Sequence, residues 1–364
     1  MSKTILIAGY YGFSNSGDDA VLASICRDIK KKGAPYKARI MSNKPGITKV
    51  DYGVEAVQRK NPLVVFNEIR KADVLLMGGG SLLQDASSSR SLYYYLSLIL
   101  MAKVVKTKVI LYANGIGPIR KRFNQWAVKQ VINNVEMITL RERLSGKVLE
   151  KIGVNRPPIY VTSDPVFNLE VKKRDVDGML QAEGIPVDKD FVAVFYRDWG
   201  KDNAYIGRTS IICDYIVDKY DMNVVFIPMK HPGDLNVSAA IRKEMKNKNR
   251  GYLMKEKYDS DALIQLIGHS KFIISMRLHA LLYAAIQSRP MIGIVYDPKV
   301  KYYLDELHVQ GVEDVHDFQP EEVEGYVDEI MNNYEAVCRR IARETKHHRD
   351  QARKNIDYLI SIID

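Results

Sequence analysis

Short apolar runs that stop at glycine or polar loops recur along this chain, and segments with helical spacing follow several of them. Thr4–Ala8 stops at Gly9, and Asp73–Met77 stops at a row of three glycines. Runs this continuous are typical of parallel strands that helices cover on both faces, not of strands with one face in water. The pattern therefore predicts an α/β fold built from strand–loop–helix units.

The alternation occurs twice. Its first strands are predicted at Thr4–Ala8, Ala38–Met41, Asp73–Met77, Lys108–Ala113 and Met137–Leu140, and its second set at Phe191–Tyr196, Val224–Pro228, Phe272–Ser275 and Met291–Tyr296. Residues 165–190 between them are polar and charged, and the chain after Pro320 reads as helix. Because 364 residues suit two domains, we expect two doubly wound, Rossmann-like domains at 1–170 and 171–320 that face each other across a cleft, then C-terminal helices at 321–364.

The charge balance favours an anionic partner. Lysine and arginine number 54 against 44 aspartates and glutamates, a net charge of +10 that suits a polyanion, an anionic membrane surface or a small anion. Nothing resembles a nucleic-acid module. Three cysteines without a CxxC pair, and no HExxH motif, predict neither a disulfide framework nor a metal site. The N-terminal run is too short for a signal peptide, so we expect a cytoplasmic protein.

Two segments raise the question of membrane contact. Leu92–Ala102 is strongly apolar but too short to cross a bilayer, so it is either a buried helix or a helix that rests on a membrane or lines an apolar groove. Residues 339–354 hold seven basic residues against two acidic ones. This stretch is either a solvated helix face or a surface that docks on anionic lipid at the inner face of the cell membrane.

The loops at the predicted strand ends are the candidate binding segments, because ligands of doubly wound sheets bind beyond the carboxyl ends of the strands. In the first domain these loops combine aromatic rings, amides and carboxylates, which suits a sugar: rings stack on its apolar faces and polar groups bind its hydroxyls. Asp18 or Asp19 either takes a proton from a sugar hydroxyl or caps the first helix. The acceptor candidates are Tyr11, Phe13, Asn15, Asp18, Asp19, Gly79, Gly80, Asp85 and Asn114.

The second domain offers cationic side chains instead. Arg197 follows the first strand of that domain, His231 follows the second, and Ser275, Arg277 and His279 follow the third. We expect Ser275 to cap the helix Leu278–Ile286, whose positive end then joins an arginine and an imidazole in an anion site with a proton donor. The alternatives are a surface arginine beside a packed histidine, and a surface ion pair between Arg197 and Asp198.

These loops, in this order, resemble the polysaccharide pyruvyl transferase family, and within it the CsaB-type members. The matching segments span almost the whole chain: GYYGFSNSGDDAVL at 9–22, LLMGGGSLLQD at 75–85, ANGIGP at 113–118, SDPVF at 163–167, HPGD at 231–234 and SMRLHALLYAA at 275–285. Each motif is weak alone, but six in register are specific. The resemblance implies a GT-B-like fold and makes Arg277 and His279 the donor-site pair, with Arg197 near the donor.

The resemblance also implies a reaction. Pyruvate passes from phosphoenolpyruvate, a co-substrate and not a cofactor, to two hydroxyls of one sugar, giving a 4,6-ketal and phosphate. In CsaB-like members the sugar is N-acetylmannosamine of a lipid-linked secondary cell-wall polymer that anchors S-layer proteins. The residues fit this chemistry: Arg197 and Arg277 suit the two anionic groups, His279 suits the proton donor, and Asp18 or Asp19 suits the base. No cofactor or metal is expected.

Two alternatives remain open at this point. A nucleotide-sugar glycosyltransferase of the same fold would need an acidic residue for the ribose hydroxyls and a base-binding loop, and the second domain offers no convincing candidate for either. A non-catalytic module that binds cell-wall glycans is compatible with the composition.

Overall fold

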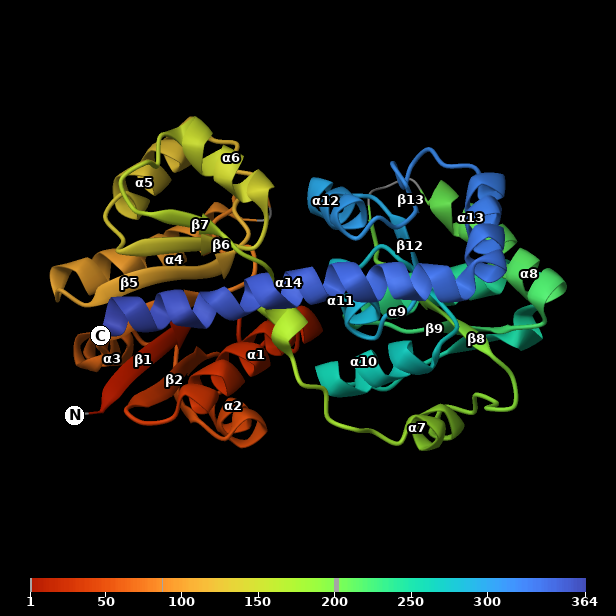
Figure 1. The fold of residues 1–364 in the computed structure, drawn as a ribbon, viewed down its shortest axis with the longest axis horizontal. Helices are drawn as coiled ribbons and strands as arrows, with labels where there is room; N and C mark the ends of the chain where they lie inside the picture. The colour runs from red at the N-terminus through yellow and green to blue at the C-terminus, as the bar shows by residue number, and fades with distance from the viewer. Residues whose placement is uncertain (1, 87, 200–202) are drawn as a thin grey trace. The chain divides into compact units, whose positions relative to one another are not determined.

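The computed structural model describes residues 2–86, 88–199 and 203–364, and divides the chain into two units. The first unit comprises Met1–Glu170 and His348–Asp364, and the second comprises Val171–His347. The long helix α14 (Tyr334–Ile363) begins in the second unit and ends in the first (Figure 1). The C-terminal end of the chain therefore belongs to the first unit. The polar stretch at residues 165–190 predicts a single boundary and gives no sign of this return.

The first unit contains a parallel sheet of seven strands in the order β3-β2-β1-β4-β5-β6-β7. The strands are β1 (Lys3–Ala8), β2 (Tyr36–Ser42), β3 (Glu55–Gln58), β4 (Val74–Gly78), β5 (Lys108–Asn114), β6 (Met137–Leu140) and β7 (Ile159–Val161). Its helices are α1 (Ser16–Lys32), α2 (Pro45–Tyr52), α3 (Pro62–Lys71), α4 (Ser89–Val104), α5 (Arg122–Ile132), α6 (Arg143–Ile152) and the short η1 (Pro165–Asn168). β4 is buried along its whole length, and β1 and β5 are buried beyond Thr4 and Lys108, as their continuous apolar runs predict.

The second unit contains a parallel sheet of six strands in the order β10-β9-β8-β11-β12-β13. The strands are β8 (Phe191–Phe195), β9 (Asn223–Phe226), β10 (Gly251–Leu253), β11 (Ile273–Ser275), β12 (Met291–Ile294) and β13 (Gly311–Val312). Its helices are α7 (Val176–Ala182), α8 (Ala204–Tyr220), α9 (Gly233–Glu244), α10 (Ser260–His269), α11 (Leu278–Ile286), α12 (Pro298–Glu306) and α13 (Pro320–Asn332), with η2 at Lys248–Arg250. Each unit thus has the layered α/β architecture predicted, with its own apolar core.

The last turns of α14 pack into the first unit through polar contacts as well as apolar ones. Thr162 donates a hydrogen bond to the Asn355 side chain at 2.8 Å, and Ser163 pairs with His348 at 2.9 Å. All four side chains are buried. Among the described residues no helix is both long and apolar enough to cross a membrane.

Candidate functional site

The strand order of each sheet reverses once, and ligands of doubly wound sheets bind at that point. In the first unit the reversal lies between β1 and β4, so the loops after Ala8 and Gly78 meet there. In the second unit it lies between β8 and β11, where the loops after Phe195 and Ser275 meet. The predicted acceptor and donor loops therefore occupy the expected binding position of their own sheets.

The loop after β1 leads into α1, which begins at Ser16. The helical spacing of Val21, Leu22, Ile25 and Ile29 predicts a helix only from Asp19, three residues later. The N-cap is Asn15, whose side-chain oxygen accepts a hydrogen bond from the Gly17 amide at 3.2 Å. Asp18 and Asp19 lie inside the first turn, so neither is the cap, and the capping alternative for these two residues is wrong. Both carboxyl groups remain available for other contacts at the positive end of α1.

Asp18 lies against the glycine loop that follows β4. A Cβ atom placed on Gly80 would come within 2.8 Å of Asp18 Oδ1, and the backbone φ of Gly80 is +66°. The pKa of the Asp18 carboxyl is raised to about 7, mainly by burial and also by neighbouring Asp19 and Asp164, while Arg141 lowers it. A carboxyl group with this pKa exchanges a proton near neutral pH, which is what a general base requires.

The pKa of Asp19 is also raised, to about 6, by burial and by the nearby Asp51 carboxylate, while a hydrogen bond from Tyr52 lowers it. Of the two acidic residues left open as the base by the sequence, Asp18 has the pKa nearer to neutrality and the contact with the glycine loop.

Arg141 organises the site from the end of β6, although sequence reasoning did not select it. Its guanidinium donates to Asp164 at 2.7 Å and to Glu142 at 3.1 Å, and all three side chains are almost completely buried. It also approaches the Ser81 hydroxyl at 3.5 Å. Two features of the sequence could have pointed to Arg141. It follows a predicted strand directly, and its partner Asp164 belongs to the SDPVF segment.

The glycine loop after β4 and the loop after β5 are joined to each other. Asn114 donates from Nδ2 to the Gly79 carbonyl at 2.8 Å, and the Gly115 amide donates to the Gly80 carbonyl at 2.8 Å. The Asp85 carboxylate accepts hydrogen bonds from the amides of Arg120 and Lys121 and from the Asn124 side chain. Asn114 and Asp85 are buried, and their hydrogen bonds stabilise these loops; the acceptor contacts expected of both residues stay predictions.

The aromatic residues of the first loop divide into two kinds. Tyr11 is 1% exposed and its hydroxyl donates to the Gly78 carbonyl at 2.6 Å, so it supports the loop from below and is not the exposed sugar contact that the sequence suggests. Phe13 stacks on Tyr10, with ring centroids 4.1 Å apart. The buried Arg59 lies over the Phe13 ring and donates to the Gly9 carbonyl at 2.8 Å, which fixes the loop from β3.

In the second unit, Arg277 is held by Asp234 of the HPGD segment. Arg277 Nε donates to Asp234 Oδ2 at 3.0 Å, and Nη2 contacts Oδ1. Asp234 is buried, and its Oδ2 also accepts from the amides of Met229 and Lys230 at 3.2 and 3.0 Å. This network fixes both the guanidinium and the loop after β9.

The turn before α11 differs in detail from the prediction. The N-cap position is Arg277, and no side chain of the described residues makes a capping hydrogen bond there. The Ser275 hydroxyl accepts a hydrogen bond from the Arg277 amide at 2.9 Å and donates to the Arg277 carbonyl at 3.0 Å. Ser275 therefore stabilises the turn two residues before the helix and does not cap it, because the chain needs one more extended residue before helical geometry begins.

Arg197 and Arg277 leave neighbouring strands at the same level. Phe195 and Ser275 are paired in the parallel ladder, and each arginine lies two residues further on. Arg197 lies between two aromatic rings, 4.9 Å from Trp199 and 4.7 Å from Tyr296, and it donates to the Tyr296 hydroxyl at 2.9 Å. Its contacts are thus aromatic, and no ion pair with Asp198 is found among the described residues.

The two histidines differ in position. His279 lies in the first turn of α11, half-buried, with its ring centroid 6.3 Å from that of Tyr283. His231 lies in the loop after β9, and its Nε2 is 3.0 Å from the carbonyl oxygen of Lys255. Arg197, Arg277 and His279 therefore follow the two strands at the reversal point, and His231 follows the neighbouring strand β9.

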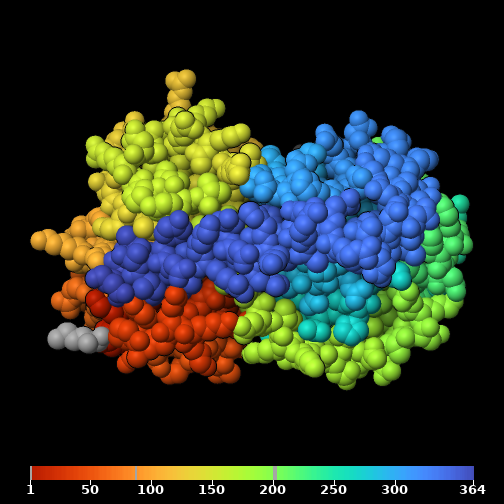
Figure 2. All heavy atoms as spheres, in the orientation of Figure 1, coloured from red at the N-terminus to blue at the C-terminus, as the bar shows by residue number. Residues whose placement is uncertain are grey.

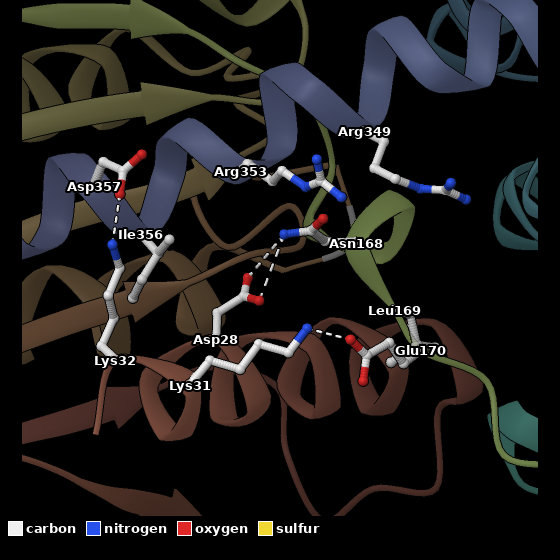
Figure 3. A pocket seen from close by; sticks show the side chains of 10 residues that line it. All are labelled: Asp28, Lys31, Lys32, Asn168, Leu169, Glu170, Arg349, Arg353, Ile356 and Asp357. Atoms are coloured by element: carbon white, nitrogen blue, oxygen red, sulfur yellow. Dashed lines mark hydrogen bonds and ion pairs between the residues drawn. The ribbon is translucent and has the colours of Figure 1, made fainter. Parts of the chain in front are cut away.

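A pocket of about 530 Å³ lies elsewhere on the first unit (Figure 3). In Figure 2 the C-terminal part of α14 (dark blue) and the N-terminal segment (red) both reach the surface that is seen. Lys31 pairs with Glu170 and Lys32 with Asp357 at 2.8 Å, so both lysines are neutralised. The pocket is lined by Asp28, Lys31, Lys32, Asn168, Leu169, Glu170, Arg349, Arg353, Ile356 and Asp357.

This pocket lies at the C-terminal end of α1, whereas Asp18 and Asp19 lie at its start. No residue predicted as a site residue lines it. Within residues 2–86, 88–199 and 203–364, no cluster of three histidine, cysteine or acidic side chains could hold a metal ion.

Comparison with solved structures shows the fold. The UDP-GlcNAc 2-epimerase of Methanocaldococcus jannaschii superposes with a TM-score of 0.69 over 99% of this chain and 100% of its own, at 13% identity. The MnaA protein of S. aureus, solved with UDP, gives 0.67 over 100% and 98% at 12% identity. Anabaena HepE, solved with UDP-glucose, gives 0.66 over 99% and 100% at 9% identity. These likenesses confirm the predicted GT-B-like class with two Rossmann-like domains and a helical C-terminus.

Comparison with known sequences shows the family. The amylovoran biosynthesis protein AmsJ of Erwinia amylovora is 21% identical over 300 residues, which are 78% of this chain and 71% of AmsJ. The model of the family described as polysaccharide pyruvyl transferase matches residues 15–298, most of the chain, including Asp18, Arg197, Arg277 and His279. The chain belongs to the polysaccharide pyruvyl transferase family.

Proposed function

We propose that this chain transfers pyruvate from phosphoenolpyruvate to two hydroxyls of one sugar, as a 4,6-ketal, and releases phosphate. The single observation that carries the proposal is that Arg197 and Arg277 extend from paired positions of β8 and β11, at the reversal point of the second sheet. Adjacent parallel strands lie about 5 Å apart, so two cations leave the sheet edge close together. Phosphoenolpyruvate carries a carboxylate and a phosphate at a comparable spacing, and arginine suits both groups.

The donor residues take distinct roles. Arg277, oriented by Asp234, binds one anionic group, and Arg197, held between Trp199 and Tyr296, binds the other. His279, in the first turn of α11, supplies a proton to C3 of the enol, which becomes the methyl group. C2 is then electrophilic, and the amide groups at the start of α11 stabilise the phosphate charge.

The acceptor residues follow from the first unit. Asp18 accepts the proton of the first attacking hydroxyl, whose oxygen forms a bond to C2. The oxygen of the second hydroxyl then forms the other C2–O bond as the C2–O bond to phosphate breaks, and phosphate leaves with the electron pair and the second proton. The raised pKa of Asp18, about 7, supports this role because the group is partly ionised at neutral pH.

We further propose the acceptor and its place in the cell. The six motifs of the CsaB type suggest N-acetylmannosamine of a secondary cell-wall polymer, modified while on its lipid carrier at the inner face of the membrane, in a polymer that anchors S-layer proteins. The family match supports a polysaccharide acceptor, and the AmsJ likeness supports a place in polysaccharide biosynthesis.

One experiment tests the proposal. The full chain is incubated with phosphoenolpyruvate and a synthetic N-acetylmannosamine disaccharide, and phosphate release and acceptor mass are followed. We expect acceptor-dependent phosphate release and an acceptor heavier by one pyruvate less one water. A rise in melting temperature with UDP-glucose or UDP-N-acetylglucosamine but not with phosphoenolpyruvate, and no phosphate release, would instead indicate a nucleotide-sugar enzyme.

A further inference from the structure

The outer face of α4 is apolar, although its inner face already fills the core. Leu92, Leu96 and Ile99 are buried against the sheet. Tyr93, Leu100 and Val104, by contrast, are exposed. Their spacing of seven and four residues places them in one stripe along the helix, within about 40° of each other. An exposed apolar stripe beside a complete core is unusual for a surface helix and marks a contact surface.

The neighbouring helix α5 extends this stripe with two large rings. Phe123 is 64% exposed and Trp126 is 57% exposed, and their ring centroids lie 5.5 Å apart. Phe123 also contacts Tyr93 edge-on at 6.5 Å, and the Tyr93 hydroxyl donates to Asn124 Oδ1 at 2.5 Å. The five exposed residues Tyr93, Leu100, Val104, Phe123 and Trp126 form what we name the α4–α5 patch.

The segment that carries the α4–α5 patch has side-chain charges of one sign, although Glu136, directly after it in sequence, pairs with Lys103 at 2.6 Å. Residues 86–135, which contain both helices, include eight lysine or arginine residues and no aspartate or glutamate. The average of 44 acidic residues in 364 would give about six in such a stretch. Arg90 lies one turn before Tyr93, Lys121 donates from Nζ to Ser89 Oγ at 3.1 Å, and Arg122 precedes Phe123. All three cations are exposed.

We propose that the α4–α5 patch docks on an anionic phospholipid bilayer, with Phe123 and Trp126 inserted at the headgroup level and the basic residues on the lipid phosphates. Exposed aromatic rings bordered by cations, without acidic residues, are the composition of surfaces that lie in a membrane interface. The proposal does not depend on the chemistry of pyruvyl transfer, and it places on the first unit a membrane contact that the sequence alone suggested for the basic stretch of α14.

The chain carries a reporter for this surface, since its two tryptophans are Trp126 and Trp199. In Trp199→Phe, all tryptophan emission comes from Trp126. Vesicles of phosphatidylcholine with phosphatidylglycerol should shift this emission to shorter wavelength and protect it from iodide, and brominated lipid should quench it. Vesicle binding without any change in Trp126 emission would overturn the proposal, because another surface would then make the contact.

Matched variants distinguish binding through the α4–α5 patch from nonspecific binding by exposed apolar residues. Because these side chains are exposed, Phe123→Ser with Trp126→Ser should keep the fold and lower vesicle affinity at least about tenfold, since binding scales with the apolar area inserted. Val50→Ser and Ile211→Ser, at exposed apolar residues elsewhere, should leave it unchanged. Arg122→Glu should weaken binding, and Arg353→Glu on α14 should not. Equal losses in the patch variants and their controls, or full binding to phosphatidylcholine alone, would contradict the proposal.

A second copy of the chain is the competing occupant. Sedimentation of the wild-type chain and the Phe123→Ser, Trp126→Ser variant decides between the two. We expect the same mass for both in the absence of lipid. A wild-type dimer that the double variant converts to a monomer, with vesicle binding unchanged, would assign the patch to self-association and overturn the membrane proposal.

Discussion

Arg277 is held by the buried carboxylate of Asp234 through Nε–Oδ2 at 3.0 Å and Nη2–Oδ1, a contact that joins two sequence motifs 43 residues apart. The carboxylate also accepts two backbone amides. A guanidinium fixed in this way keeps its remaining N–H groups in one orientation, which suits recognition of a small anion. Asp234 thus acts through Arg277 as a positioning residue.

Asp234→Asn should weaken donor binding more than turnover. The amide nitrogen cannot accept from Arg277, so the guanidinium loses one of its two contacts and its orientation. We expect the KM for phosphoenolpyruvate to rise about tenfold or more, with a smaller change in kcat, since a lost charged hydrogen bond costs about 1.5–3 kcal/mol. Steady-state phosphate release measures both constants.

The matched control is Asp305→Ala, which removes an exposed ion pair with Lys301 in the same unit. Its constants should remain those of the wild type, because exposed pairs contribute little. An unchanged KM in Asp234→Asn would mean that Arg277 does not depend on this carboxylate for its orientation.

The pH dependence of turnover should report Asp18. A base must be ionised to accept a proton, so activity limited by a group of pKa about 7 increases with pH through neutrality and levels off above it. Asp18→Asn should lose activity by at least about a hundredfold. Asp19→Asn should stay active but shift the profile toward lower pH, because the Asp19 carboxylate raises the pKa of Asp18. A profile that persists in Asp18→Asn would assign the base elsewhere.

Gly80→Ala should perturb the same carboxylate without removing it. Its φ of +66° strains any side chain, and the added Cβ would lie 2.8 Å from Asp18 Oδ1. We expect a stability loss of about 1–2 kcal/mol and an altered pH profile. The control is Gly325→Ala in α13, where a Cβ meets nothing within 4 Å and should stabilise the helix by about 0.5–1 kcal/mol. Normal kinetics in Gly80→Ala would place Asp18 outside the reaction.

Asp28 predicts a pH effect on stability. Burial raises its pKa from 3.8 to about 6, opposed by a hydrogen bond from Asn168. The folded state therefore binds the proton more tightly than the unfolded chain, so this group makes stability fall as pH rises from about 4 to 6. Asp28→Asn should gain up to about 3 kcal/mol over the wild type at pH 7 and little at pH 4. Urea unfolding at both pH values measures the difference, and an equal effect at both would refute it.

Local pattern was sufficient for much of the fold. The bounds of β6 and α11 match their predicted residues, because apolar runs and periodicity define both elements. α1 begins earlier than predicted because its first turn contains polar residues only, and α9 was not predicted because Pro232 and Gly233 read as a turn. Apolar periodicity detects helices that have a buried face, and it misses helical turns that have no buried apolar residue.

The candidate site divides in the same way. Arg197, Arg277 and His279 could be selected because strand ends in a doubly wound sheet are known binding positions. The sequence could not reveal that Asp234 pairs with Arg277 or that Arg141 pairs with Asp164, because both pairs join residues distant in sequence. The burial of Tyr11 and Asp85 was likewise hidden, because a loop sequence does not show which of its side chains turns inward.

The most direct test of the donor site is acceptor-dependent phosphate release from phosphoenolpyruvate by the wild type, Arg277→Ala and His279→Ala, with exposed Arg339→Ala as control. We predict that Arg339→Ala behaves as wild type and that both site variants lose at least about a hundredfold in kcat/KM, while circular dichroism shows them folded. Wild-type rates in folded Arg277→Ala and His279→Ala would contradict the assignment of phosphoenolpyruvate to the second unit.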